Sequence, residues 1–150
     1  MQIDLSILTP SNASLTLRLI SEVIKDFKTK QFGNFIQKYF LQGKKVIEIG
    51  CGRGEFLTLL YQFDVDAYGL EYSEASVAQC VKNGLQVSKG YLDSKAKVLA
   101  TGPFDAFVLL MFMEHMPDPN SALKGIYDNL SDGAIGLVEV PNFDMMLRNK

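Results

Sequence analysis

The 150-residue chain is long enough for one domain with a single sizeable core, which favours one domain over two. Its hydrophobic fraction of 47% and charged fraction of 21% are ordinary for a globular protein in water. No apolar run approaches the roughly 18 residues that a membrane-spanning helix needs, and the first residues lack the basic start and apolar stretch of a signal peptide. We therefore expect no membrane partner.

The charges and cysteines narrow the function further. The formal net charge is −2, and the 15 basic residues are scattered along the chain, which argues against a nucleic-acid backbone as the main partner. The two cysteines, Cys51 and Cys80, have no metal-ligand spacing and form no disulfide framework, which favours a reducing cytoplasm. Cys51 precedes a predicted helix N-terminus, so it is either a reactive thiol or, as we favour, a small side chain filling a loop.

The first 43 residues are predicted to be mainly helical. Residues 1–13 are rich in turn formers, whereas apolar residues recur at helical spacing from Ser14 to about Lys30 and indicate an amphipathic helix. A second helical stretch runs from about Asn34 to Leu41, before Gly43 breaks it. Residues 1–43 therefore form a helical extension that packs on the remaining domain, as we favour, or lines a substrate pocket as a lid.

From residue 44 onward, short apolar runs alternate with helical segments. Strands are predicted over 45–49, 66–71, 85–88, 104–111 and 134–140, and helices over 55–63, 74–83 and 120–130. The long apolar run over 104–111 is consistent with a strand buried on both faces. This alternation predicts an α/β fold with a Rossmann-like, doubly wound, mainly parallel sheet and right-handed crossovers.

A glycine loop carries the strongest functional signal. Glu48, Gly50, Cys51, Gly52 and Gly54 lie in a segment that directly follows a predicted strand and opens a predicted helix. Glycines allow a ligand to approach the backbone closely, and the helix end offers free N–H groups to an anionic or carboxylate group. The alternative is a tight strand-to-helix turn without a ligand.

The spacing of these glycines favours a cofactor without phosphates. They recur at every second residue, whereas a dinucleotide site has Gly-x-Gly-x-x-Gly and a P-loop has Gly-Lys-Ser/Thr. Gly54 is followed instead by Glu55, whose carboxylate would repel a pyrophosphate at this position. The loop therefore points to a nucleoside-type cofactor.

An acidic residue at the end of the second strand supports a nucleoside site. Glu71 lies about 20 residues after the loop, where a carboxylate can accept hydrogen bonds from both hydroxyls of a ribose. Alone, such a residue is more often solvated or caps a helix. The neighbouring Tyr72 either lies against an adenine face or is simply exposed.

The end of the 104–111 strand offers a candidate base. Ligands of open α/β sheets bind outside the carboxyl ends of the strands, near the switch point, and His115, the only histidine, falls there. An imidazole with a pKa of about 6.5 suits a general base, although a structural hydrogen-bonding role is favoured. Glu114 and His115 alone do not support a metal site, so no metal is expected. Asp118 before Pro119 is predicted to be a turn or N-cap residue.

Together these motifs resemble the class I S-adenosylmethionine-dependent methyltransferase family. The segment 46–54 is similar to its first motif, 68–71 to its acidic second-strand motif, and 104–110 with 114–119 to its fourth-strand motif. The resemblance runs from about residue 42 to 147. Segments 69–71, 80–87 and 140–143 look closest to the small-molecule and sugar methyltransferases and to methyltransferase-like proteins associated with methionine biosynthesis.

The resemblance implies S-adenosylmethionine as the cofactor, S-adenosylhomocysteine as the product, and a role for each motif. The loop glycines would approach the methionine part, Glu71 would hold the ribose, and the fourth strand end would lie under the cofactor. Many relatives have Gly-Asp where this chain has Gly90-Tyr91, so either Tyr91 stacks on adenine or Leu92 and Asp93 take over that contact. The predicted cofactor-binding residues are Glu48, Gly50, Cys51, Gly52, Gly54, Glu71, Tyr72, Tyr91, Leu92, Leu110 and Met111.

The function expected from the resemblance is direct methyl transfer to a small-molecule acceptor, with His115 as the candidate catalytic base. One alternative is a catalytically weak, methyltransferase-like binding or regulatory protein. Another is a nicotinamide-dependent oxidoreductase, which the glycine spacing and Glu55 disfavour.

The family's sheet normally continues past the fifth strand with a helix and an antiparallel pair, whereas this sequence stops at Lys150. We therefore expect residues 44–150 to be a cofactor-binding domain truncated at its C-terminus. A homodimer would cover the free edge of the fifth strand.

Overall fold

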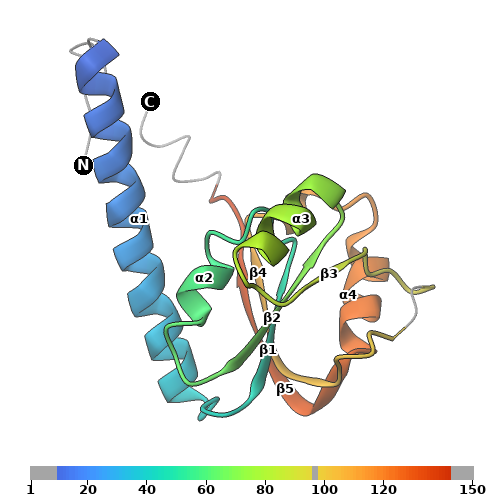
Figure 1. Ribbon diagram of the computed structural model, residues 1–150. Coiled ribbons are helices and arrows are strands. Elements are labelled where there is room, and N and C mark those ends of the chain that lie inside the picture. Colours follow the sequence, from blue (N-terminus) through green and yellow to red (C-terminus); the bar gives the residue numbers. More distant parts are fainter. Residues whose placement is uncertain (1–9, 96–97, 143–150) are drawn as a thin grey trace.

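The computed structural model describes residues 10–95 and 98–142, and these form a parallel sheet with helices on both faces (Figure 1). The strands are β1 (Lys45–Ile49), β2 (Asp66–Glu71), β3 (Val87–Lys89), β4 (Phe104–Leu110) and β5 (Leu130–Glu139). The helices are α1 (Pro10–Lys38), α2 (Leu57–Leu60), α3 (Glu74–Lys82) and α4 (Pro119–Tyr127), with a 3₁₀ turn, η2, over Met113–His115.

The sheet has the order β3-β2-β1-β4-β5, and each neighbouring pair runs parallel. The chain moves outward from β1 to β3 and then crosses back to β4 on the other side of β1. The switch point, where ligands of open α/β sheets bind, therefore lies between β1 and β4. This topology confirms the predicted Rossmann-like fold.

The sheet separates two hydrophobic cores. Helices α1, α2 and α3 cover one face, where the core contains Phe32, Phe35, Ile36, Val46, Leu57, Leu60, Cys80 and Val108. Helix α4 covers the other face, where the core contains Ile47, Ile49, Leu70, Phe104, Leu109, Ala122 and Ile126. Alternate residues of β1 enter opposite cores, which explains why Val46, Ile47 and Ile49 of this central strand are all apolar.

The bounds of β1 and β2 agree with the sequence prediction, whereas β3 begins two residues later than predicted. The difference arises because Leu85 closes the turn that follows α3 instead of opening a strand. Its N–H donates to the carbonyl oxygen of Cys80 at 3.0 Å, and its buried side chain packs against Gly54.

The prediction of two N-terminal helices is wrong, because α1 is one continuous helix of 29 residues that extends beyond the sheet (Figure 1). Gly33 was expected to fall between the two helices. It lies inside α1, where a Cβ would come within 3.3 Å of the Phe63 ring. Close packing against Phe63 therefore explains a glycine inside this helix.

Other elements also differ in length from the prediction: α4 ends at Tyr127 instead of residue 130, β4 ends one residue early at Leu110, and the largest differences are in α2 and β5. Helix α2 has four residues instead of nine, and i to i+3 hydrogen bonds to Gln62 and Phe63 tighten the chain after it. Strand β5 begins at Leu130 instead of Ala134, because a register shift opposite Phe104 and Ala106 accommodates extra residues in β5. Its predicted last residue, Val140, lies just beyond the strand.

The C-terminus of α1 contains a strained residue. Phe40 has a φ of +55°, and its side chain is 81% exposed. The N–H of Leu41 donates to the carbonyl oxygen of Ile36 at 3.0 Å, and the N–H of Phe40 donates to that of Gln37 at 3.4 Å, which is the Schellman pattern. Glycine usually occupies the position of Phe40 in this motif.

We expect Phe40→Gly to stabilise the protein by roughly 0.5–1 kcal/mol, because it relieves the left-handed conformation and removes little packing. Urea unfolding measures this change. The matched control is Phe40→Ala, which loses the ring and keeps the Cβ, and should bring no gain. Equal stability of the glycine and alanine variants would contradict the assignment of strain to the Cβ.

Candidate functional site

The glycine loop turns sharply at the carboxyl end of β1. Gly50, Gly52 and Gly54 have φ values of +71°, +54° and +84°, a region that glycine adopts without strain. The N–H groups of Gly50 and Cys51 donate to the carbonyl oxygen of Leu70 in β2, at 2.8 and 3.2 Å. These bonds hold the loop against the end of β2.

Glu71 is fixed at the end of β2 by two backbone donors. Its Oε2 accepts from the N–H of Gly52 at 2.9 Å, and its Oε1 accepts from the N–H of Ser73 at 2.7 Å. An ionised carboxylate offers about four lone-pair positions, so each oxygen can accept a further hydrogen bond. The loop and the predicted ribose acceptor therefore form one connected unit.

A hollow of about 300 Å³, including its part open to solvent, lies beside this unit at the carboxyl ends of the strands. Four of the predicted site residues line it: Gly50, Tyr72, Tyr91 and Leu92. The other lining residues were not predicted from the sequence: Ile49, Leu70, Gly90, Phe112, Met116 and Ile126. Most of them are apolar side chains that the sequence pattern shows only as core formers, so the fold alone brings them to the hollow.

The segment after β3 brings one residue from each alternative for the adenine contact to the hollow, and leaves Asp93 outside its lining. Tyr91, 38% exposed, and Leu92, 4% exposed, line the hollow. Asp93 turns toward its own loop, where its Oδ1 accepts from the N–H of Lys95 at 2.8 Å. Its backbone packs on α4 so closely that a Cβ at Gly125 would lie 2.5 Å from the Asp93 carbonyl oxygen.

The side chain of Cys51 points into the core under the loop. Its Sγ would lie 2.7 Å from a Cβ at Gly69, and the residue is buried. Burial raises the pKa of the Cys51 thiol, and the nearby Glu48 raises it further. A thiol that stays protonated is a poor nucleophile, so the geometry favours the structural role of Cys51.

Several predicted residues lie at the edge of the site. Leu110 is buried in the core beneath α1, and Met111 follows it, half exposed, with a φ of +49°. His115 is exposed in η2, and its side chain does not line the hollow. Its role as a base stays a prediction. Asp118 is the predicted N-cap, because it accepts from the N–H of Ser121 at 3.1 Å.

Glu48 is a buried acid directly before the loop. It is 3% exposed, and its Oε2 has no hydrogen-bond partner among the described residues. Burial, and to a smaller extent the carboxylate of Glu55, raise the pKa of Glu48 to about 8 against the opposing effect of the Lys28 ammonium. Glu48 therefore keeps its proton at neutral pH and leaves one acceptor oxygen free.

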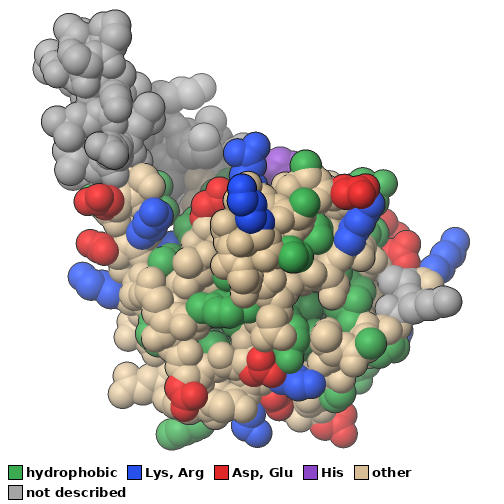
Figure 2. Space-filling model, viewed as in Figure 1, with side chains coloured by type: hydrophobic (Ala, Val, Ile, Leu, Met, Phe, Trp, Pro, Cys, Tyr) green, Lys and Arg blue, Asp and Glu red, His purple; other side chains and the backbone are tan. Residues whose placement is uncertain are grey.

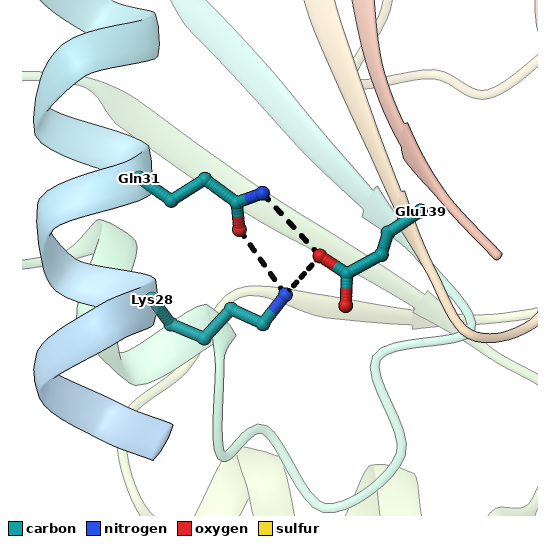
Figure 3. A network of polar contacts seen from close by, with 3 residues as sticks. All are labelled: Lys28, Gln31 and Glu139. Atoms are coloured by element: carbon teal, nitrogen blue, oxygen red, sulfur yellow. Dashed lines mark hydrogen bonds and ion pairs between the residues drawn. The ribbon is translucent and has the colours of Figure 1, made fainter. Parts of the chain in front are cut away.

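A partly buried polar network joins α1 to the end of β5 (Figure 3). Lys28, 4% exposed, forms an ion pair with Glu139, and its Nζ donates to Gln31 Oε1 at 3.1 Å. Gln31 Nε2 donates to Glu139 Oε2 at 3.3 Å, and the Phe27 and Phe56 ring centres lie 5.8 and 5.6 Å from Lys28 Nζ. The network anchors α1 beside the carboxyl ends of the strands.

The surface carries mixed charges. On the face seen in Figure 2, Lys and Arg side chains are interspersed with Asp and Glu. Among residues 10–95 and 98–142, no cluster of three His, Cys, Asp or Glu side chains could hold a metal ion. Over the same described ranges, each helix is too short or too polar to cross a bilayer.

Comparison with known proteins places this geometry in a family. Residues 30–148, which include the glycine loop, Glu71 and the residues that line the hollow, match the family described as methionine biosynthesis protein MetW. The chain belongs to the MetW family. The network between Lys28 and Glu139 thus joins a residue just before the matched region to one inside it.

The MetW-family chain is also similar to methyltransferases. It is 33% identical over 89 residues to the ubiquinone biosynthesis O-methyltransferase of Bordetella avium, covering 56% of this chain and 37% of that relative. The structure of DesVI from Streptomyces venezuelae aligns with a TM-score of 0.67 at 16% identity, over 89% of this chain and 58% of that one.

A second solved structure shares the fold. The plantazolicin methyltransferase BpumL, in complex with SAH, aligns with a TM-score of 0.63 at 20% identity. The alignment covers 83% of this chain and 50% of BpumL. The MetW-family chain thus spans about half the length of these solved structures, and less of the curated relative.

Proposed function

We propose that this MetW-family chain binds S-adenosylmethionine and transfers its methyl group to a small-molecule acceptor. The observation that carries the proposal is the 2.9 Å hydrogen bond from the Gly52 N–H to Glu71 Oε2, which joins the glycine loop and the ribose acceptor at the edge of the hollow. The likeness to ubiquinone biosynthesis O-methyltransferase and to BpumL with SAH supports it.

The residues present fit this cofactor. The apolar walls given by Tyr91 and Leu92 suit adenine, and the fixed carboxylate of Glu71 suits the ribose hydroxyls. The space next to Gly52 is open, because the nearest atom to a Cβ there is 4.0 Å away. Glutamate is the acceptor type that a hydroxyl or ammonium donor needs.

The chemistry places modest demands on the chain. S-adenosylmethionine supplies a methyl group made electrophilic by a positively charged sulfur, so no residue has to activate it. The chain's residues orient the reactants and exclude water, which can contribute on the order of 7–11 kcal/mol. A base is needed only for an acceptor that must lose a proton, and His115 is our candidate.

Isothermal titration with S-adenosylmethionine and S-adenosylhomocysteine tests the proposal. We expect the wild type to bind both, and Glu71→Ala to weaken both roughly 10- to 100-fold, because the ribose hydroxyls lose a charged acceptor. Glu74→Ala is the matched control, since it removes an exposed carboxylate three residues further on and should bind normally. Absence of binding by folded wild-type protein would overturn the cofactor assignment.

A second candidate function is a regulatory protein that binds the cofactor without catalysis. It is favoured by the exposure of His115, which lies outside the hollow lining. Assays across phenols, amines and carboxylic acids separate the two functions. Methyl transfer to any class supports the enzyme, whereas binding without turnover supports the regulatory protein.

We extend the proposal to location and organisation. Two free buried thiols, Cys51 and Cys80, support a cytoplasmic location. Residues 44–150 would form the cofactor-binding domain, and 1–43 an extension that packs on it, supported by the buried Phe32 and Ile36 of α1.

A further inference from the structure

Phe112 closes the side of the hollow next to the glycine loop. A Cβ built on Gly50 would lie 2.7–2.8 Å from the Cγ, Cδ1 and Cδ2 atoms of its ring, so the ring packs directly on the Gly50 backbone. Phe112 follows Met111, whose φ is +49°, and its carbonyl oxygen accepts from the His115 N–H at 3.0 Å. The left-handed residue and the 3₁₀ turn thus hold the ring against the loop.

The chemistry of the proposed cofactor puts its charge near this ring. The sulfur joins the ribose to the amino-acid chain. If Glu71 holds the ribose and the glycine loop faces the amino-acid part, the sulfur lies between them, next to the face of the Phe112 ring that is turned away from Gly50. An aromatic face attracts a cation within about 6 Å of its centre.

We propose that Phe112 is a specificity-determining residue that favours the positively charged sulfur of S-adenosylmethionine over the neutral sulfur of S-adenosylhomocysteine. This inference rests on the proposed function. The two ligands share the adenine, the ribose and the amino-acid end, so contacts at Glu71 and Tyr72 cannot tell them apart. A ring beside the sulfur can, because only one of the two ligands has a charge there.

A preference for the charged sulfur would affect the methyl donor and the product in opposite ways. A ring that adds affinity only for the charged form retains the methyl donor and releases the product more readily. From the strength of cation–π contacts, the expected preference is about 3- to 30-fold.

The test is a comparison of three ligands on three proteins by isothermal titration. Wild type, Phe112→Leu and Phe112→Met are titrated with S-adenosylmethionine, S-adenosylhomocysteine and sinefungin, an analogue with a charged ammonium near the sulfur position. Both variants keep apolar bulk and lose the ring. We expect S-adenosylmethionine and sinefungin to weaken about 3- to 30-fold more than S-adenosylhomocysteine.

Tyr72→Leu is the matched control, because it removes an aromatic ring from the nucleoside end, and it should change the affinity for all three ligands by a similar factor. Circular dichroism checks folding, and two Phe112 variants keep the test valid if one fails to fold. An equal loss for all three ligands, or no loss, overturns the role of Phe112. Wild-type protein that binds none of them overturns the proposed function itself.

Discussion

Replacing Glu48 with glutamine is expected to stabilise the protein increasingly as the pH rises from about 4.5 to about 8. Burial raises the pKa of Glu48 from 4.5 to about 8 in the folded chain. Below pH 4.5 the carboxyl is protonated in both the folded and unfolded chains, so its titration does not change the free energy of unfolding. Between the two values the unfolded chain releases the proton and the folded chain keeps it, so the wild type loses stability.

The expected size of the stability difference follows from the shift in the pKa of Glu48. Each pH unit between the two pKa values changes the free energy of unfolding by about 1.4 kcal/mol, so the full window is worth on the order of 4–5 kcal/mol. Above about pH 8 the difference between the two proteins becomes constant. Glutamine does not titrate, and any fixed cost of placing its amide in the core is an offset that leaves the slope unchanged.

Urea unfolding of the wild type and Glu48→Gln at about pH 5, 6.5 and 8 measures this slope. Glu22→Gln is the matched control, because it makes the same substitution at an exposed position of α1, outside the core. A difference between wild type and Glu48→Gln that stays flat over this range would mean that Glu48 is ionised in the folded chain.

The elements predicted best from sequence are those with a local signal at both ends. β1 and β2 agree because compact apolar runs are bounded by the glycine loop and by Glu71. The continuity of α1 could not be predicted, because Gly33 is a local helix breaker and its compensation comes from Phe63, 30 residues away. Helix ends that depend on such distant packing carry no local signal.

The candidate site also contains some residues that the sequence predicts and others that only the fold reveals. The loop glycines and Glu71 were predicted from motif spacing, which places them at strand ends, and Tyr91 and Leu92 were predicted from the family resemblance. Phe112 was missed, because only the fold shows that its ring meets Gly50. An aromatic side chain directly after the apolar 104–111 strand was the available signal. The burial of Lys28 was equally invisible, because its partner Glu139 is 111 residues away in the sequence.

The ion pair between Lys28 and Glu139 is expected to matter through its burial. Glu139→Gln leaves the ammonium of Lys28, 4% exposed, without its counter-charge, and should cost about 3 kcal/mol. Lys28→Met should cost less, because the side chain of Glu139 is 28% exposed and can be solvated. Urea unfolding at constant pH measures both.

The double variant Lys28→Met with Glu139→Gln tests whether the stability lost in Glu139→Gln comes from the unpaired charge of Lys28. Methionine suits the space between the Phe27 and Phe56 rings, and glutamine can still bond to Gln31. We therefore expect the double variant to be more stable than Glu139→Gln alone, since no unpaired buried charge remains. Additive losses would show that the two residues act independently. Recovery of stability in the double variant would show that the ion pair adds little net stability. Its role would then be to fix the position of α1 beside the site.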